Sequence, residues 1–495
     1  MTGQPVRLPD AAARLADLET QVRYQIRDTR YETPPWQRRD PSGVYPVVIV
    51  GAGQAGLAAA FGLRRKGIED VIVLESAAEG KAGPWPTYAR MRTLRTSKHS
   101  RWPAWDVPAA TPRLWFCAVY GEMAWDDIEF FPTDDWFAFL EWYRRIIDID
   151  VRFGKSVCSM TAATGGRGVE LTTTDAAGVT ETIVARRVIL ATGIEGAGGP
   201  RVPDMIAQLP SDLWNHTHDD IDFAALRGKR IGVLGAGTSA FDNAALALES
   251  GARTVTVHMR RDRMPMVSPY RWMEFPPIIE QYAALSDDQK WEFNQHLTFV
   301  DQPATQQAIW RAYAHPGFSV RYESPWEAVG LDGDQIVVTT KSGTHIYDFV
   351  IAATGVAVDL ARRREFAAFV DDIMLWADRD APVRDPRYAE LLEYPYLGNG
   401  YALKSKSGAN DDLCGRVYMF NHGARMSAGV LCHQVSGLVG GLPRLVDDVV
   451  ADIVSEFGSA LIEEFLRYDE SAGVVDGPRI TQQHNIIKSE YLSGI

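Results

Sequence analysis

Cysteine is scarce in this sequence, with 4 residues among 495. No CxxC pair occurs, and the two closest cysteines are 18 residues apart. Closely spaced cysteines are what a zinc site or a redox-active disulfide usually requires. We therefore expect no metal site, and we expect all four cysteines to be reduced and mostly buried: Cys117, Cys158, Cys414 and Cys432.

Long hydrophobic runs are also absent. No stretch holds 18 uncharged apolar residues, and residues 1–30 lack the apolar core of a signal peptide. Neither a membrane span nor export is predicted, and the cytoplasm is the expected location.

Positive charge is in the minority. Lys and Arg number 51 against 64 Asp and Glu, which gives a net charge of −13. Such a chain has no overall attraction for phosphate backbones or anionic lipids. Nucleic acid and membranes are therefore not expected as partners.

The length and composition favour a globular protein of several domains. A chain of 495 residues exceeds the roughly 250–300 residues that one hydrophobic core supports. Hydrophobic residues make up 46% and charged residues 23%, which is typical of soluble globular proteins. No low-complexity linker occurs, so the domains are expected to pack closely.

An internal near-repeat is the strongest pattern in the sequence. The segment VVIVGAGQAG at 47–56 recurs in weaker form 184 residues later as IGVLGAGTSA at 231–240. Each copy has an apolar strand, a glycine turn and an alanine-rich helix, and a second apolar run follows at 70–75 or 254–258. This order predicts two βαβ units, each with one dinucleotide site.

The first copy carries the full dinucleotide fingerprint. Gly51 allows the tight turn, Gly53 lets the backbone approach a pyrophosphate, and Gly56 lets the helix pack on the strand. Glu75 lies 19 residues past Gly56, where an acid holds a ribose hydroxyl. An unliganded turn is the alternative interpretation.

The second copy differs at the position of that acid. Gly235 and Gly237 are present, Ala240 takes the third place, and Arg260 and Arg261 stand near the position of the acid. Cations there suit a 2′-phosphate, which predicts NADP(H) at this site. The alternative is that both arginines are solvated surface charges.

The two motifs, together with Ala-Thr-Gly at 191–193 and 353–355 and the segment 418–441, resemble the class B flavin-dependent monooxygenases. This group includes flavin-containing monooxygenases, amine N-hydroxylases and Baeyer–Villiger enzymes. The resemblance runs from about residue 45 to 455. It implies an α/β fold with two Rossmann-like dinucleotide-binding domains, in which an NADPH domain is inserted into an FAD domain.

The resemblance also implies domain boundaries. They are an N-terminal helical extension at 1–40, the first part of the FAD domain at 41–226, the NADPH domain at 227–355 with a helical insertion at about 275–315, and the second part of the FAD domain with a C-terminal tail at 356–495.

Cofactor-binding residues follow from the same resemblance. Trp85 is expected to cover the flavin or, alternatively, to pack in the core. Ser427 and Gly429 are expected just before a long helix from about 430 to 453, whose N-terminus points at the flavin ring. The complete predicted set is Gly51, Gly53, Gly56, Glu75, Trp85, Thr192, Gly193, Gly235, Gly237, Ser239, Arg260, Arg261, Thr354, Gly355, Ser427 and Gly429.

A segment rich in cations supplies the predicted catalytic and substrate-binding residues. Residues 92–98 resemble a family segment that places an asparagine beside the flavin, and Ser97 takes that place with Lys98 adjacent. A structural loop is the alternative. Five cations lie within 12 residues here, and we expect Arg92 and Arg95 to clamp a substrate carboxylate.

The resemblance implies a monooxygenase that uses FAD, NADPH and O2. Oxygen is expected to reach a small-molecule substrate through a flavin C4a-(hydro)peroxide. The run at 348–355 is similar to that of the N-hydroxylases, whereas the Baeyer–Villiger signature near His216 is degraded. N-hydroxylation of an amine or amino acid is therefore predicted.

Other activities remain open from the sequence. Sulfoxidation or Baeyer–Villiger oxygenation is the alternative within the family. An NADPH oxidase or a redox-sensing flavoprotein is the alternative from another class. A flavin disulfide reductase is disfavoured because no dithiol is present. The sequence is compatible with a monomer or a homo-oligomer.

Overall fold

The computed structural model describes residues 5–29, 36, 42–166, 168–379 and 385–469. The chain divides into one unit up to Val449 and a second unit from Val450. The fold and the site described below belong to the first unit. No helix in the described ranges is long and apolar enough to cross a lipid bilayer.

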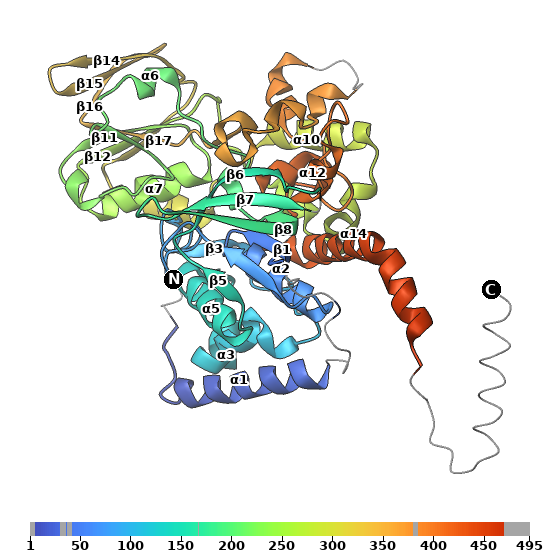
Figure 1. The fold of residues 1–495 in the computed structure, drawn as a ribbon. Helices are drawn as coiled ribbons and strands as arrows, with labels where there is room; N and C mark the ends of the chain where they lie inside the picture. Colours follow the sequence, from blue (N-terminus) through green and yellow to red (C-terminus); the bar gives the residue numbers. More distant parts are fainter. Residues whose placement is uncertain (1–4, 30–35, 37–41, 167, 380–384, 470–495) are drawn as a thin grey trace, which may run out of the picture. The chain divides into compact units, whose positions relative to one another are not determined.

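The first sheet has seven strands within the described part of the chain (Figure 1). Val48 at its centre pairs in parallel with Ile72 on one side and Val188 on the other, as the first βαβ unit predicts. Three strands of this sheet form an antiparallel meander. Along the main path the order is β5 (Asp150–Arg152), β2 (Val71–Leu74), β1 (Tyr45–Val50), β8 (Thr180–Leu190), β7 (Val169–Thr174) and β6 (Ser156–Ala162), with β19 (Val417–Met419) parallel to β8.

Helices surround this sheet and complete its core. Alanine-rich α2 (Gln54–Arg65) follows β1 and buries every residue from 55 to 63, because small side chains allow close packing on the strands. The longer α5 (Thr133–Ile146) buries Trp136, Phe139 and Tyr143. The remaining elements in this part are α1 (Ala11–Asp28), α3 (Pro112–Tyr120), α4 (Glu122–Asp127) and the two-stranded sheet of β3 (Thr93–Ser97) and β4 (Phe130–Pro132).

The second sheet has five parallel strands in the described residues and contains the second βαβ unit. Val233 pairs with Val257 on one side and Ile351 on the other. The strand order is β10 (Trp214–His216), β17 (Phe349–Ala352), β11 (Arg230–Leu234), β12 (Thr254–His258) and β13 (Phe318–Arg321). This sheet already begins before residue 227, where the inserted domain was predicted to start. A three-residue strand between polar residues gives too little periodicity to be recognised.

Different layers cover the two faces of the second sheet. Phe241 and Ala308, from α7 (Thr238–Glu249) and α11 (Gln306–Tyr313), contribute to one buried cluster with the strands. The other cluster joins the strands to α6 (Asp204–Ala207) and to an antiparallel sheet. That sheet consists of β14 (Trp326–Asp332), β15 (Gln335–Thr340) and β16 (Gly343–Tyr347).

A short antiparallel ribbon stands where the chain passes between the two sheets. β9 (Gly198–Pro200) pairs with β18 (Val356–Val358), and Pro200 lies opposite Val356. The chain therefore leaves for the second sheet and returns from it at neighbouring positions.

Helices occupy the region predicted as a helical insertion at about 275–315, and the first of them begins at Pro269. Tyr282 and Leu297 of this insertion share a buried cluster with Val430 and Leu431 from the C-terminal part of the chain. Its helices before α11 are α8 (Pro269–Met273), α9 (Pro276–Gln281) and α10 (Asp287–Val300).

The last long helix differs from the prediction of about 430 to 453. Short α13 (Arg425–Ala428) ends at Gly429, whose φ of 95° is a left-handed value, and α14 (Leu438–Arg467) starts only after a further turn. In that turn a Cβ at Gly437 would lie 1.8 Å from the carbonyl oxygen of Leu431. The apolar periodicity thus continues across a region where tight packing interrupts the helix. The other helix of this part is α12 (Asp411–Gly415).

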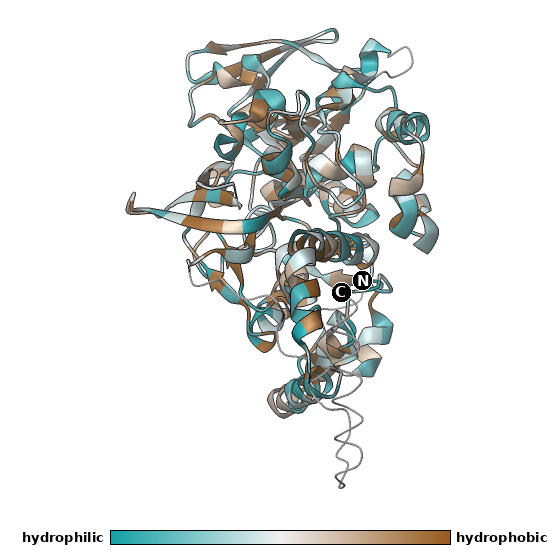
Figure 2. Cartoon of the chain, turned by 45° about the vertical axis from the view of Figure 1, so that its right-hand side comes forward, coloured by the Kyte–Doolittle hydropathy of each residue, from teal (hydrophilic) through white to brown (hydrophobic). Residues whose placement is uncertain are grey.

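Hydropathy follows these elements. Figure 2 shows hydrophobic segments within the sheets and hydrophilic residues along outer helices and loops. On α14 both kinds alternate along the helix.

Candidate active site

The carboxyl ends of β1 and β11 open on one large cavity. Its volume is about 1380 Å³, and both glycine turns, the helical insertion and the C-terminal segment line it. Ligands of open parallel sheets bind at this edge. A pocket for one drug-sized ligand has about 300–1,000 Å³, so this cavity has room for more than one ligand.

The first glycine turn has the geometry of a phosphate cradle. Gly51 has φ of 105°, and a Cβ there would lie 2.5 Å from the carbonyl oxygen of Ala191. Gly53 is the N-cap of α2 and lines the cavity, and its Cβ position has no atom within 4 Å. Gly56 lies behind the turn, where a Cβ would meet the oxygen of Gly51 at 1.9 Å. The free N–H groups of a helix N-terminus therefore face open space that suits an anion.

Glu75 lies beside this turn as predicted. Its side chain is buried and accepts hydrogen bonds from the N–H groups of Ala52 at 2.8 Å and Ala77 at 2.9 Å. Glu75 lines the cavity. A carboxylate offers about four acceptor positions, so acceptors remain for ribose hydroxyls.

Three more predicted residues lie on the same wall. Trp85 lines the cavity and meets the ring of Trp136 edge-on, with 6.4 Å between centroids. Thr192 and Gly193 also line it, and the Thr192 hydroxyl accepts a hydrogen bond from the Asn421 amide at 2.9 Å.

The second glycine turn repeats this arrangement. Gly235 has φ of 103°, and its Cβ would lie 2.4 Å from the carbonyl oxygen of Ala353. Gly237 is the N-cap of α7 with open space at its Cβ position. Gly237 and Ser239 line the cavity. Two helix N-termini therefore face one cavity.

The predicted arginines follow β12 and line the cavity as well. Arg260 and Arg261 are exposed, and Arg261 forms an ion pair with Asp301 at 3.7 Å. Thr354 and Gly355 also line the cavity, and the Thr354 hydroxyl donates a hydrogen bond to the carbonyl oxygen of Arg201.

The structure does not bring Ser427 and Gly429 to the cavity. The Ser427 hydroxyl is buried and accepts hydrogen bonds from the indole N–H of Trp376 at 3.2 Å and the backbone N–H of Leu397 at 3.1 Å. Gly429 lies against the ring of Tyr282. The cavity is lined instead by residues between 430 and 435, in the turn before α14.

Ser97 and Lys98 are not among the residues that line the cavity either. The Lys98 ammonium donates a hydrogen bond to the carbonyl oxygen of Trp125 at 2.5 Å and lies over the ring of that residue. Leu94, Arg95 and Thr96 of the same segment line the cavity. A catalytic role for Ser97 and Lys98 remains a prediction.

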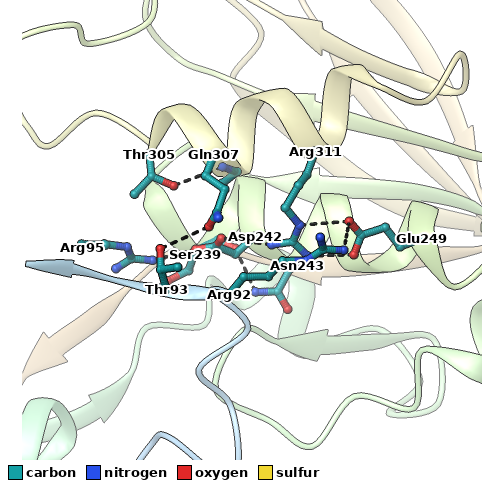
Figure 3. Close-up of polar contacts among 11 residues, drawn as sticks. Arg92, Thr93, Arg95, Ser239, Asp242, Asn243, Glu249, Thr305, Gln307 and Arg311 are labelled. Carbon is teal, nitrogen blue, oxygen red and sulfur yellow. Dashed lines mark hydrogen bonds and ion pairs between the residues drawn. The ribbon is translucent and has the colours of Figure 1, made fainter. Parts of the chain in front are cut away.

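Arg92 and Arg95 both have carboxylate partners on α7 (Figure 3). Arg92 donates to Glu249 and Arg95 to Asp242, each at 2.9 Å. Arg311 of α11 joins them, at 2.8 Å from Glu249 and 3.7 Å from Asp242. These five residues form the α7 ion-pair network, which ties β3 to the second sheet. Clamping of a substrate carboxylate by Arg92 and Arg95 stays a prediction that requires an exchange of partners.

The histidines of the degraded signature lie on another part of the wall. His218 lines the cavity, stacks on Tyr88 at 4.4 Å between ring centroids and contacts the carboxylate of Glu195. Burial lowers the pKa of His216 to about 4, and the neighbouring His218 lowers it further in the same sense. His216 is therefore neutral at pH 7.

Sequence reasoning missed a polar cluster at the C-terminal end of the cavity. The Tyr394 hydroxyl lies 3.0 Å from Nε2 of His422, whose ring centroid is 5.7 Å from that of His433. Burial, followed by the charge of Arg425, lowers the pKa of His433 to about 4. With Gln434, these side chains form what we call the C-terminal wall. The available signal was the presence of histidine, arginine and glutamine in an otherwise apolar segment.

The cysteines lie elsewhere. Cys117, Cys414 and Cys432 are buried, Cys158 is partly buried, and none of the four is among the described residues that line the cavity. The cavity therefore lacks the dithiol on which a disulfide reductase depends.

Comparisons with known proteins agree on a flavoprotein fold. Residues 48–302 match the pyridine nucleotide-disulphide oxidoreductase family. The FAD-dependent urate hydroxylase of Xanthomonas campestris pv. campestris is 38% identical over 474 residues, which cover 94% of this chain and 99% of that protein.

Solved structures with this fold include two ornithine hydroxylases. The enzyme of Pseudomonas aeruginosa matches with a TM-score of 0.65 and 16% identity over 82% of this chain and 98% of that one. The ornithine N-hydroxylase of Kutzneria sp. 744, in a structure with reduced FAD, NADP⁺ and L-ornithine, matches with a TM-score of 0.63 and 16% identity over 83% and 99%. At this identity the match shows the shared fold.

Proposed function

We propose that this chain, which belongs to the class B flavin-dependent monooxygenases, hydroxylates a nitrogen heterocycle related to urate. The enzyme uses FAD and NADPH and inserts oxygen from O2 into a small molecule. The observation that carries the proposal is that two glycine turns, each at the N-terminus of a helix, open on one cavity of about 1380 Å³.

The residues present fit both cofactors. The open space at Gly53 and the free acceptors of Glu75 would hold the diphosphate and ribose of FAD. The open space at Gly237 and the cations Arg260 and Arg261 would hold the diphosphate and 2′-phosphate of NADPH. When bound, the flavin supplies the hydride acceptance and oxygen activation that no protein side chain provides.

The protein contributes position and shielding. Part of the cavity wall is apolar, which limits the access of water. This part includes Trp85, Leu94 and Val430. The C-terminal wall provides donors and acceptors that can orient a polar substrate. Its histidines are neutral at pH 7 because burial lowers their pKa values.

The urate hydroxylase supports a heterocyclic substrate because its similarity extends over nearly the whole of both chains. The N-hydroxylation of an amine or amino acid, predicted from the sequence, is the second candidate. The resemblance of the run at 348–355 to the N-hydroxylases favours it, whereas the carboxylate partners of Arg92 and Arg95 favour the heterocycle. The proposed location of the enzyme is the cytoplasm.

Substrate-dependent turnover of the purified holoenzyme tests the proposal. NADPH oxidation, O2 uptake and H2O2 release would be measured with urate, ornithine, lysine, a thioether and a ketone, and products identified by mass spectrometry. We expect urate or a related oxopurine to stimulate NADPH oxidation with little peroxide. A hydroxylated amino acid as the main product would establish the second candidate instead. Stoichiometric peroxide with every compound would indicate an NADPH oxidase.

A further inference from the structure

Arg425 is the arginine of the C-terminal wall and lines the cavity. Its Nε donates to Oδ1 of Asn294 at 2.9 Å and its Nη2 to the hydroxyl of Thr298 at 3.1 Å, and both acceptors are uncharged. Within the described residues, no carboxylate lies within 4.0 Å of this guanidinium. Among the described residues its positive charge therefore has no counterion within ion-pair distance.

Two other arginines that line the cavity do have such a counterion. Arg201 pairs with Glu390 at 2.8 Å, and Arg363 pairs with Glu365 at 2.6 Å. Glu390 is the acidic residue of this region that adds to the field at Arg425, and it is already engaged by Arg201. Arg425 therefore differs from Arg201 and Arg363 in charge balance.

The orientation of Arg425 is fixed by buried groups. The amide of Asn294 donates to the hydroxyl of Tyr282 at 3.0 Å and to the carbonyl oxygen of Lys290 at 2.9 Å. Its carbonyl oxygen must therefore face the guanidinium. Asn294 is fully buried, so this arrangement is held by packing in α10. The two hydrogen bonds use two of the five N–H donors of arginine.

The aromatic and imidazole groups around Arg425 do not supply negative charge. Tyr394 is a neutral phenol at pH 7 because burial raises its pKa, and the rings of His422 and His433 are neutral. A cation removed from water is costly unless an anion pairs with it. The cavity therefore has a site prepared for an anion beside neutral hydrogen-bonding groups.

We propose that Arg425 binds the negatively charged edge of the substrate, and that the substrate is a planar heterocycle bound as a monoanion. This inference rests on the proposed function and names the charge state and the residue that recognises it. Gln434 and His433 line the same wall, where an amide and an imidazole can complement the N–H and C=O groups of such a ring. The guanidinium fork matches two adjacent anionic acceptors.

Ligand binding to the holoenzyme under anaerobic conditions tests this assignment. Urate, which is a monoanion at neutral pH, and hypoxanthine, which is neutral, would be titrated while the flavin spectrum is followed. For Arg425→Gln we expect the Kd of urate to rise roughly 10- to 100-fold, as for loss of a hydrogen bond to a charged group. The Kd of hypoxanthine should change by less than about threefold. Arg425→Lys should give a smaller rise for urate because it keeps the charge.

Two further variants separate charge from shape. Asn294→Asp retains Arg425 but places a carboxylate beside it, so urate binding should weaken as in Arg425→Gln. The double variant Arg363→Gln/Glu365→Gln removes a cavity guanidinium together with its counterion, and urate binding should stay within about twofold. Thermal midpoints and flavin content of each variant show that it is folded.

The same experiment distinguishes the alternatives. If Arg425→Gln changes the rate of flavin reduction by NADPH in the absence of substrate but leaves the Kd of urate unchanged, the guanidinium acts on the flavin and the proposal is wrong. An equal rise in the Kd of urate and of hypoxanthine in Arg425→Gln would also overturn the proposal, because that pattern indicates a structural role. The unmodified enzyme could instead fail to bind urate but bind ornithine or benzoate in a manner that depends on Arg425. That result would refute the proposed substrate and support the anion site.

Discussion

Gly53 shows at the scale of one residue how a missing side chain leaves open space at the N-terminus of a helix. Its backbone is not in the left-handed region, and nothing lies within 4 Å of the position of its Cβ. A side chain there would meet no protein atom and would occupy the space in front of the α2 N-terminus. The position therefore tests binding without disturbing the fold.

We expect Gly53→Val to fold and to lose FAD, because the valine fills the place of the diphosphate. The flavin absorbance of the purified protein measures the result. Gly330→Val is the matched control, since Gly330 lies in β14 with similarly open space, and it should remain yellow. A flavin-loaded Gly53→Val variant would refute the assignment of this turn.

We predict that Arg260 and Arg261 set the preference for the nucleotide. Each charge-assisted contact with the 2′-phosphate is worth about 1.5–3 kcal/mol, which corresponds to at least a tenfold preference for NADPH over NADH. Changing both residues to alanine should abolish this preference in kcat/KM. Arg263→Ala should retain it, because Arg263 is exposed nearby but does not line the cavity. Equal use of both nucleotides by the unmodified enzyme would contradict the prediction.

His258 makes the stability of the second sheet dependent on pH. Its ring nitrogens lie 2.8 Å from the Ser324 hydroxyl and 2.6 Å from that of Tyr347, and burial lowers its pKa to about 4. The unfolded chain, with a pKa near 6.5, binds the proton first as the pH falls. The contribution of His258 is therefore present above about pH 6.5 and is lost between about 6.5 and 4.

The free energy of unfolding should fall less steeply with decreasing pH in His258→Gln than in the unmodified protein. We expect the difference in slope to be about 1.4 kcal/mol per pH unit in the middle of the range between about pH 6.5 and 4. Urea unfolding at a series of pH values measures it. The variant His296→Gln, at an exposed position of α10, should follow the unmodified protein. If the free energy of unfolding depends on pH in the same way in all three proteins, His258 is not the titrating group.

The α7 ion-pair network acts at the scale of elements, because it holds β3 against α7 and α11. Its members differ in burial. The side chain of Asp242 is 4% exposed and that of Arg95 25%, whereas Arg92 is 61% exposed. Removing one partner of a buried charge costs more than breaking an exposed ion pair.

Arg95→Gln should therefore lower the free energy of unfolding by about 1–3 kcal/mol, and Arg92→Gln by less than about 1 kcal/mol. Denaturant unfolding with a domain-sensitive fluorescence signal provides the measurement. The same two variants test the predicted carboxylate clamp. A rise in KM for amino acids alone, with unchanged stability, would assign both arginines to the substrate.

Elements whose information is local could be predicted from the sequence. Each βαβ unit combines an apolar run, a glycine turn and an alanine-rich helix within about 30 residues, and β1, α2, β11 and α7 confirm that prediction. The start of α14 could not be predicted, because the packing of Gly437 against Leu431 depends on a fold that the hydrophobic period does not contain. The C-terminal wall could not be predicted for the same reason, because Asn294 and Arg425 are in contact although they are 131 residues apart in the sequence.

At the scale of the whole first unit, the near-repeat explains why each of the two sheets has a glycine turn at its carboxyl edge, and the fold brings both turns to one cavity. Parallel strands place their carboxyl ends, and hence their glycine turns, at one edge of each sheet. The sequence could indicate two such edges but could not indicate that they face each other. It also could not show which side chains of the cationic segment line the cavity, since that depends on pairing of β3 with β4 and on the carboxylates of α7.

The ribbon of β9 and β18 has a consequence for the origin of the molecule. Pro200 and Val356 lie opposite each other in register, although 155 residues separate them. A gene that encoded only the first sheet could have closed this gap with a tight hairpin, and a second nucleotide-binding gene segment could have entered at that hairpin without breaking any strand of the host. The second glycine turn would then have reached the first by insertion of one gene segment into another. Replacing residues 201–355 with a short hairpin between Pro200 and Val356 would reconstruct such an ancestor.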